Sequence, residues 1–217
     1  MTLYDSCIKE REELASFMRR LYTQKLTTCS GGNLSMRLDD EHIIITPSSL
    51  DKGLISAEQI GLMKLDGENL TPHLKPSIES GMHIKIFQTR ADVNAIVHAH
   101  PVTATSFSAT EKQININLTA EAFVVLQHVV YASYELMGTD SLADIVAKSL
   151  QDSNVAIMKN HGVTTVANNL LSAFDKLEVL ENAAIMTLNT HILQSLSPLH
   201  DDNIEQLCTW MGKPTQK

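Results

Sequence analysis

Three histidines in the chain have the type and spacing expected of a metal site. His98 and His100 end a short apolar run, and side chains two residues apart on a strand project from the same face. Catalytic zinc takes three protein ligands and keeps one position open, so a third ligand is needed. His161, which follows another apolar run and precedes the small Gly162, is the best candidate. Each histidine alone would more often be a packed, hydrogen-bonded residue, but three imidazoles without a thiolate favour a Lewis-acid zinc.

Glu79 is the candidate proton carrier. It stands four residues before His83, so the two side chains are predicted to share one face of a helix over residues 77–89. A carboxylate near a helix start is usually a capping or solvated group. Beside an open metal position, the same carboxylate can carry a proton to and from a substrate. The residues alone leave both interpretations open.

Two loops rich in serine and glycine are candidate anion sites. They cover residues 30–35 and 46–49, and Ser77 adds a further hydroxyl group. Successive backbone N–H groups in a glycine-rich turn, with hydroxyl groups beside them, can bind an anion. Turns use the same residue types for conformational reasons, so the signal comes from the occurrence of these segments together with the histidines.

The composition is typical of one folded domain. The 217 residues include 17 Lys and Arg against 25 Asp and Glu, and this net charge of -8 argues against nucleic-acid and anionic-lipid partners. No apolar run approaches the roughly 20 residues of a membrane-spanning helix, and the charged N-terminus has no signal core, so we expect a cytoplasmic protein. Three cysteines without a CxxC pair predict free thiols.

The elements that must position these groups alternate between helices and strands. Hydrophobic periodicity predicts helices over the first 25 residues and over 77–89, 120–126, 141–150 and 170–196. Short β-branched runs predict strands at 42–46, 60–65, 95–100, 128–132, 155–158 and 163–166, with a turn at 66–67 leading to a partner strand around 68–70. The pattern indicates a single α/β layered domain with a mixed sheet over residues 1–217, whose tail 198–217 has a further helix and a polar, mobile end.

The ordered motifs resemble the class II aldolase/adducin family, most nearly its zinc aldolases of the L-fuculose 1-phosphate type. The likeness extends from the first helix to about Leu196, and its motifs are SGGNLS, IITPSS, KPSIE followed four residues on by His83, IVHAHP and KNHGV. The histidine pair of IVHAHP, followed about 60 residues later by KNHGV, is the most specific part. The resemblance implies a three-layer α/β/α sandwich around a largely antiparallel sheet, and a homotetramer with active sites at subunit boundaries.

The resemblance also implies roles for individual residues. His98, His100 and His161 would bind one Zn²⁺ per chain, or another divalent transition metal. Glu79 would donate and accept the proton and would occupy the metal in the empty enzyme. The substrate phosphate would be bound by Gly32, Asn33, Ser48, Ser49 and Ser77. Glu121 lies where some dehydratases of the family place a catalytic acid, although a solvated helix-start residue is the simpler interpretation.

Three departures from the family pattern affect the expected substrate contacts. Ile78 stands where a second hydroxyl residue is usual, and Ser49 stands where the family usually has glycine. Isoleucine offers no hydrogen-bond donor, and serine adopts a positive φ only at a cost. Either Lys52 or Lys75 then helps to bind the phosphate, or the substrate is not a simple phosphate ester. All four tyrosines precede residue 135, so the tail lacks the tyrosine that fuculose aldolases use there.

The activity that the resemblance implies is reversible, zinc-dependent cleavage of a small ketose phosphate to dihydroxyacetone phosphate and an aldehyde. The same scaffold supports metal-dependent dehydratases, decarboxylases and epimerases of sugar phosphates. The epimerases usually carry aspartate at the position of Glu79, which makes epimerisation the weaker alternative. A non-catalytic, adducin-like association module is the alternative of another class, although such domains lack the full histidine set.

Overall fold

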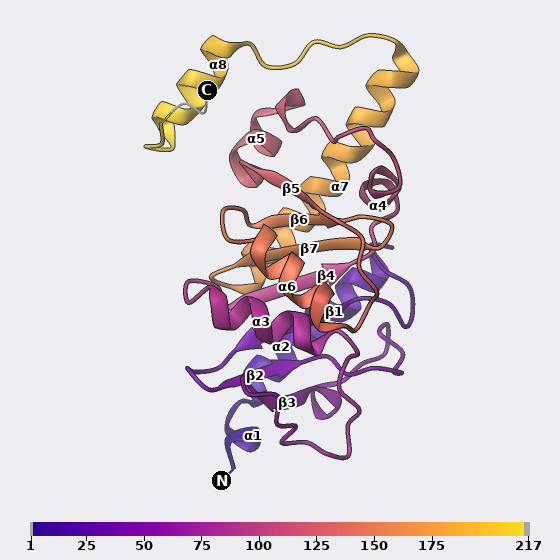
Figure 1. Ribbon diagram of the computed structural model, residues 1–217, viewed down its shortest axis with the longest axis vertical. Coiled ribbons are helices and arrows are strands. Elements are labelled where there is room, and N and C mark those ends of the chain that lie inside the picture. Colours follow the sequence, from indigo (N-terminus) through magenta and orange to yellow (C-terminus); the bar gives the residue numbers. More distant parts are fainter. Residues whose placement is uncertain (1, 215–217) are drawn as a thin grey trace.

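Seven strands form the central sheet of the protein, described here by a computed structural model of residues 2–214. They are β1 (Asn33–Arg37), β2 (His42–Ile45), β3 (Gly61–Lys64), β4 (Ala95–Ala99), β5 (Val129–Ala132), β6 (Val155–Met158) and β7 (Gly162–Ala167). Their order across the sheet is β3-β2-β1-β4-β7-β6-β5 (Figure 1). Of the described strand pairs only β5 and β6 run parallel. The predicted mixed, largely antiparallel sheet is confirmed.

Helices cover both faces of this sheet (Figure 1). One layer contains α3 (Ser80–Thr89) and α6 (Asp140–Ser149), which pack against each other. The opposite layer contains α2 (Ile8–Thr23), α4 (Val102–Ser108), α5 (Ala120–Leu126) and α7 (Leu170–Leu193). The shorter elements are α1 (Leu3–Ser6) and the 3₁₀ turns η1 (Ala57–Gln59) and η2 (Ile116–Leu118). The predicted three-layer α/β/α sandwich is therefore confirmed.

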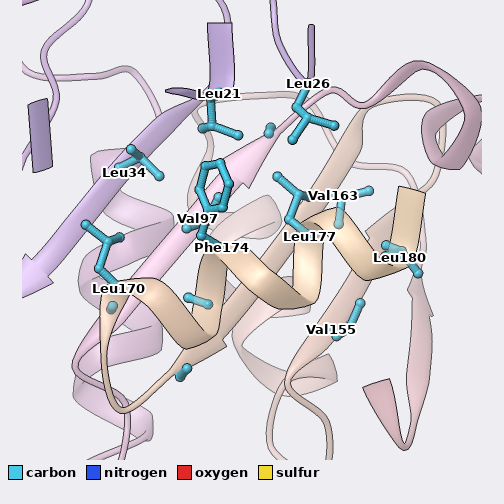
Figure 2. Close-up of a cluster of buried hydrophobic side chains, with 14 of the residues drawn as sticks. Leu21, Leu26, Leu34, Val97, Val155, Val163, Leu170, Phe174, Leu177 and Leu180 are labelled. Atoms are coloured by element: carbon cyan, nitrogen blue, oxygen red, sulfur yellow. The ribbon is translucent and has the colours of Figure 1, made fainter. Parts of the chain in front are cut away.

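Alternating side chains along the strands supply two separate hydrophobic cores. Ile44 of β2 belongs to the core under α2 and α7, whereas its neighbour Ile45 belongs to the core under α3 and α6. Val97 and Ile96 of β4 divide in the same way. Figure 2 shows the first core, in which Phe174 of α7 lies against the strands. Both faces of the sheet are thus buried, which keeps its strand ends in fixed positions.

Strand β1 is the main element that the sequence pattern did not reveal. Residues 30–35 were predicted as a loop, but β1 begins at Asn33 and pairs with β2 on one side and β4 on the other. Its Asn33 and Ser35 side chains are polar yet buried, so the strand lacks the apolar alternation on which strand prediction depends. That prediction was wrong because the polar residues of β1 face the site described below.

The other differences concern element boundaries. The N-terminal helix is interrupted at Cys7, which separates α1 from α2. The predicted partner strand at 68–70 is reduced to a single bridge between Met63 and Asn69. The helix predicted over 77–89 begins at Ser80, and the last long helix ends at Leu193, where Gln194 takes a left-handed conformation.

The C-terminal tail contains the predicted further helix, α8 (Asp201–Trp210). A long connection separates α8 from α7 and places it away from the central sheet (Figure 1). Residues 215–217 lie outside the described residues, so the mobility expected for the tail end stays a prediction. Among the described helices, none combines the length and the apolar character that crossing a membrane requires.

The packing of α7 gives a first testable prediction. Phe174 is fully buried and meets Phe17 edge to face at 5.2 Å between ring centroids. We expect Phe174→Ala to lower the free energy of unfolding by about 3–5 kcal/mol, because it removes apolar burial and leaves a cavity. Urea unfolding measures the change. Leu171→Ala on the same helix is the control, since that side chain is 58% exposed; equal losses in the two variants would contradict the assigned core.

Candidate metal centre and active site

Three imidazoles converge where β4 ends and β7 begins. His98 lies on β4, His100 follows its last residue, and His161 precedes the first residue of β7. The antiparallel pairing of these strands sets Ala99 opposite Val163, which brings the turn with His161 beside the histidine pair. One nitrogen from each ring lies within 4.8 Å of the others. The structure thus brings together the three predicted ligands, and their arrangement can hold a metal ion.

The His98 ring is held in a single orientation. Its Nδ1–H donates to the carbonyl oxygen of Val163 at 3.0 Å, and the hydroxyl of Thr164 lies 3.3 Å from the same nitrogen. The hydrogen bond at Nδ1 leaves the lone pair on Nε2 free to bind a metal. A hydrogen bond from the second ring nitrogen to a carbonyl is typical of metal-binding histidines, because it fixes both the tautomer and the ring plane.

Two glycines make room for these rings. A Cβ atom at Gly162 would lie 2.5 Å from Cδ2 of His100 and 2.7 Å from the carbonyl oxygen of Ala99. Gly32 has a φ of +68°, and a Cβ there would lie 2.8 Å from the carbonyl oxygen of His98. Neither position can accept a side chain without displacing backbone, so the small residue next to His161 leaves room for the ligand rings.

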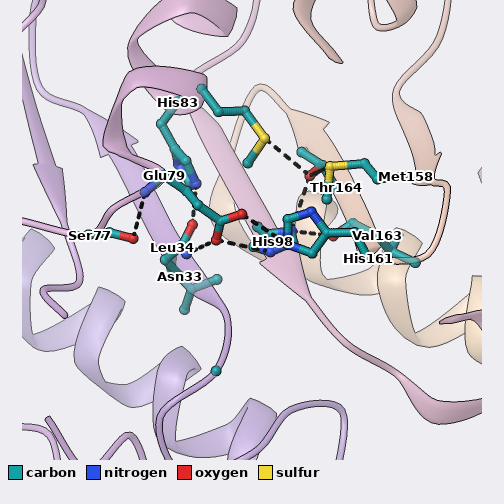
Figure 3. A network of polar contacts seen from close by, with 12 residues as sticks. Asn33, Leu34, Ser77, Glu79, His83, His98, Met158, His161, Val163 and Thr164 are labelled. Atoms are coloured by element: carbon teal, nitrogen blue, oxygen red, sulfur yellow. Dashed lines mark hydrogen bonds and ion pairs between the residues drawn. The ribbon is translucent and has the colours of Figure 1, made fainter. Parts of the chain in front are cut away.

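Glu79 points into the histidine cluster, as Figure 3 shows. It is buried and immediately precedes α3. The N–H of His83 donates to the carbonyl oxygen of Glu79 at 3.4 Å and both side chains bond Asn33, so the two lie on one side of the helix start, as the spacing predicts. Its Oε2 lies 3.2 Å from Nε2 of His98, and its Oε1 lies 3.0 Å from Nε2 of His161. Asn33 donates a hydrogen bond from Nδ2 to Oε2 at 2.8 Å.

The contacts around Glu79 suit a cation. Among residues 2–214, His98 Nε2 and Glu79 Oε1 are buried atoms without a hydrogen-bond partner of suitable geometry. A buried polar atom without a partner costs stability, and a metal ion would satisfy both atoms. Burial, reinforced by the neighbouring imidazoles, lowers the pKa of His100 to about 3, so this ring is neutral as a metal ligand must be. The residues present therefore fit a divalent metal.

The carboxyl group of Glu79 stays ionised. Burial opposes its charge, but the electrostatic attraction of the adjacent His98 and hydrogen bonds from its neighbours outweigh burial and hold the pKa of Glu79 far below its usual range. A carboxylate with two imidazole nitrogens in contact is placed to exchange a proton with a ligand at the same point. This geometry agrees with the predicted role of a proton carrier.

A chain of buried hydrogen bonds orients Glu79. Since a carboxylate only accepts, Asn33 must turn its Nδ2 toward Glu79 and its Oδ1 toward His83. Nε2–H of His83 then donates to Oδ1 of Asn33 at 2.5 Å, and the hydroxyl of Ser35 donates to Nδ1 of His83 at 2.6 Å. Burial lowers the pKa of His83 to about 3, which keeps the ring neutral and the chain intact.

The predicted anion-binding residues line one pocket of about 620 Å³ together with Glu79, His100 and His161. They are Gly32, Asn33, Ser48, Ser49 and Ser77. Ser49 has a φ of +60°, so serine keeps the conformation for which the family pattern has glycine. Ser77 accepts a hydrogen bond from the Glu79 N–H at 3.3 Å, which leaves its hydroxyl proton free for a ligand. The side chain of Asn33 bonds both Glu79 and His83, and its contact with a phosphate stays a prediction.

Glu121 is not part of this group. It is exposed in the first turn of α5 and does not line the pocket formed by its own chain.

Three residues around the site were not predicted. The sequence indicated no role for His83 and did not single out Ser35 or Thr164. The spacing of His83 from Glu79 was the available signal, but the contact runs through Asn33 on a strand 46 residues earlier in the chain.

The space left by Gly162 gives a second prediction. We expect Gly162→Ala to displace the His100 ring and to lower bound metal well below that of the parent, as elemental analysis would measure. Gly81→Ala is the matched control, because a Cβ at Gly81 meets nothing within 4 Å. Alanine also favours the helix that contains Gly81, by about 1 kcal/mol. Full metal content in Gly162→Ala would contradict the assignment of His100 as a ligand.

The family model described as Class II Aldolase and Adducin N-terminal domain matches residues 12–188 of the chain. An L-fuculose phosphate aldolase of Methanococcus maripaludis (strain C7 / ATCC BAA-1331) is 40% identical over 76% of this chain and 88% of that protein. A 5-deoxy-D-ribulose 1-phosphate aldolase of Bacillus thuringiensis serovar kurstaki is 30% identical, with 92% and 93% covered. A 3-oxo-tetronate 4-phosphate decarboxylase of Haemophilus influenzae is 27% identical, with 82% and 86% covered.

The fold is also that of a solved L-fuculose 1-phosphate aldolase. That structure superimposes with a TM-score of 0.84 at 29% identity, and the match covers 93% of this chain and 95% of the other. Residues 12–188, which the family model matches, include all seven strands and every candidate site residue. The protein therefore belongs to the class II aldolase and adducin family.

Proposed function

We propose that the protein is a zinc-dependent aldolase that reversibly cleaves a small ketose 1-phosphate to dihydroxyacetone phosphate and an aldehyde. The observation that carries this proposal is the position of Glu79. Its carboxylate contacts His98 and His161 within a pocket whose other residues include Ser48 and Ser77. A proton carrier, a metal site and hydroxyl groups suited to a phosphate thus share one pocket.

The metal would be held by His98, His100 and His161. Zinc is the ion that a neutral three-histidine set without a thiolate favours, although another divalent transition metal would fit the same donors. When bound, the metal supplies a Lewis acid that stabilises the negative charge developing on the carbonyl oxygen during carbon–carbon cleavage. The one-zinc stoichiometry follows from the single three-histidine cluster found among the described residues.

Glu79 would handle the proton on carbon. In cleavage, the carbon that remains with the ketone must gain a proton after the aldehyde leaves, and in condensation the same carbon must lose one. The Asn33 hydrogen bond at 2.8 Å holds one carboxylate oxygen, so the other oxygen is free to face that carbon. The hydroxyl groups of Ser48, Ser49 and Ser77, which line the same pocket, would bind the phosphate and so fix the position of the carbon.

Decarboxylation, dehydration and epimerisation are the alternative reactions at this site, and each is judged by a different observation. A decarboxylase of an oxo-acid phosphate is favoured by two relatives, and it would use the same metal ligands. Dehydration would need an acid such as Glu121, which does not line the pocket within this chain. Epimerisation is disfavoured by glutamate at position 79. Release of an aldehyde from a panel of ketose phosphates distinguishes aldol cleavage from these reactions, and bound metal distinguishes an enzyme from an adducin-like association module.

A cytoplasmic homotetramer is the assembly that we propose. The support in this chain is an apolar surface at the end of α7 and just beyond it, where Ile192, Leu193 and Leu196 are at least 60% exposed. Apolar side chains gathered in this way are typical of an interface with another protein surface.

Metal removal tests the proposal directly. The purified protein should contain about one zinc per chain by elemental analysis, because one cluster of three histidines is available. Treatment with a chelator should abolish aldehyde release, and added Zn²⁺ should restore it. Full activity of the metal-free protein would refute the zinc mechanism.

The role of Glu79 gives a separate prediction. Glu79→Gln keeps an oxygen for the Asn33 hydrogen bond but cannot carry the proton. We expect kcat for cleavage to fall by about 10²–10⁴-fold, the usual contribution of general acid–base catalysis, while bound metal stays at the parent level. Glu12→Gln, an exposed glutamate on α2, is the matched control. Unchanged kcat in Glu79→Gln would show that another group moves the proton.

A further inference from the structure

A lysine lies buried in the wall of the active-site pocket. Lys52 is 1% exposed, and it lines the same pocket as Ser48 and Glu79. Its Nζ donates a hydrogen bond to the carbonyl oxygen of Pro47. No carboxylate oxygen of residues 2–214 lies within 4.0 Å of this nitrogen, so the ammonium group has one neutral acceptor and no counter-charge.

Burial of such a group is costly. A charged side chain removed from water normally needs an ion pair, and without one its pKa shifts toward the neutral form. Burial lowers the pKa of Lys52 to about 8, so the side chain still carries its charge at neutral pH. A buried cation that stays charged without a partner in its own chain is a site for an anionic ligand, because the low dielectric strengthens the attraction.

The backbone around Lys52 joins the three loops that carry the anion-binding residues. Its N–H donates to the carbonyl oxygen of Cys29 at 2.8 Å, which ties it to the glycine-rich loop. The N–H of Ser48, in the loop that also contains Lys52, donates to the carbonyl oxygen of Lys75 at 3.0 Å. This bond ties the Ser48 loop to the segment before Ser77. These bonds fix Lys52 and the serine hydroxyls in one assembly, so the charge does not need to reorganise when a ligand arrives.

We propose that Lys52 is the cation that binds the phosphate group of the substrate and that selects a phosphorylated sugar over a neutral one. The inference rests on the proposed function, since it assigns the charge of that substrate to one residue. It also accounts for Ile78, which is 55% exposed, lines the pocket and offers no hydrogen bond to an anion. An ammonium group supplies more attraction to phosphate than the hydroxyl that Ile78 replaces.

Phosphate binding without turnover is the first test. In thermal unfolding at pH 7, inorganic phosphate should raise the Tm of the parent, and it should have little effect on Lys52→Met. In phosphate-free buffer Lys52→Met should itself have a higher Tm than the parent, because the variant no longer buries an unpaired charge. Lys75→Met is the matched comparison, since Lys75 lines the same pocket but is exposed. It should keep most of the phosphate response.

Steady-state kinetics is the second test. Lys52→Met should raise KM for a ketose 1-phosphate at least about tenfold, the loss expected for a charged hydrogen bond, with a smaller effect on kcat. Cleavage of the unphosphorylated ketose should not change. Lys52→Gln keeps a donor for the Pro47 carbonyl without the charge, so it should resemble Lys52→Met if charge is what matters.

The outcomes separate this proposal from the proposed function. An unaltered phosphate response in Lys52→Met overturns the proposal, because the anion then binds elsewhere, such as at the metal. A lower Tm in Lys52→Met that Lys52→Gln restores also overturns it, since Lys52 would then only hold the Pro47 loop. A parent that binds phosphate through Lys52 but cleaves no ketose phosphate supports the proposal while refuting the aldolase. If the parent cleaves the ketose phosphate and Lys52→Met does so with an unchanged KM, the aldolase is supported and the role of Lys52 is overturned.

Discussion

The antiparallel pairing of β4 with β7 is the constraint on which the site depends. It joins two stretches of chain more than sixty residues apart, and it places His161 beside His98 and His100. The same pairing supplies the Val163 carbonyl that fixes the His98 ring. Because both faces of the sheet are covered by helices, the strand ends cannot shift independently, and the three rings keep their positions without the help of a disulfide or a long loop.

Much of this arrangement follows from local sequence patterns. The alternation of side chains on a strand predicted that His98 and His100 share a face, and the apolar runs around His161 predicted a second strand end. That these two strand ends lie side by side depends on the order of strands in the sheet, which hydrophobic periodicity does not encode. Only the resemblance to a family indicated that the three histidines meet. The role of Gly162 could be predicted because a small residue beside a ligand has a simple steric meaning.

The features that the sequence did not predict are those in which polar residues are buried. β1 escaped detection because Asn33 and Ser35 occupy positions where a strand would ordinarily present apolar side chains. His83 gained its role only through Asn33, a contact between distant segments. Lys52 lies in a loop after two serines and an aspartate, and lysines in polar loops are usually solvated. Its burial comes from packing against segments distant in the sequence, which no local pattern predicts. A buried polar residue in a functional site thus interrupts the alternation of apolar side chains from which the strand that contains it would be predicted.

The hydrogen-bond chain from Ser35 to Glu79 has a direction, and this direction distinguishes the two oxygens of the carboxyl group. Oε2 receives the Asn33 amide, and reversing that amide would break its bond with His83 as well. When Glu79 takes up a proton, the proton must therefore reside on Oε1, the atom without such a bond. The neutral imidazole of His83, which bonds Asn33 and not the carboxylate, thus decides which of the two Glu79 oxygens carries the proton.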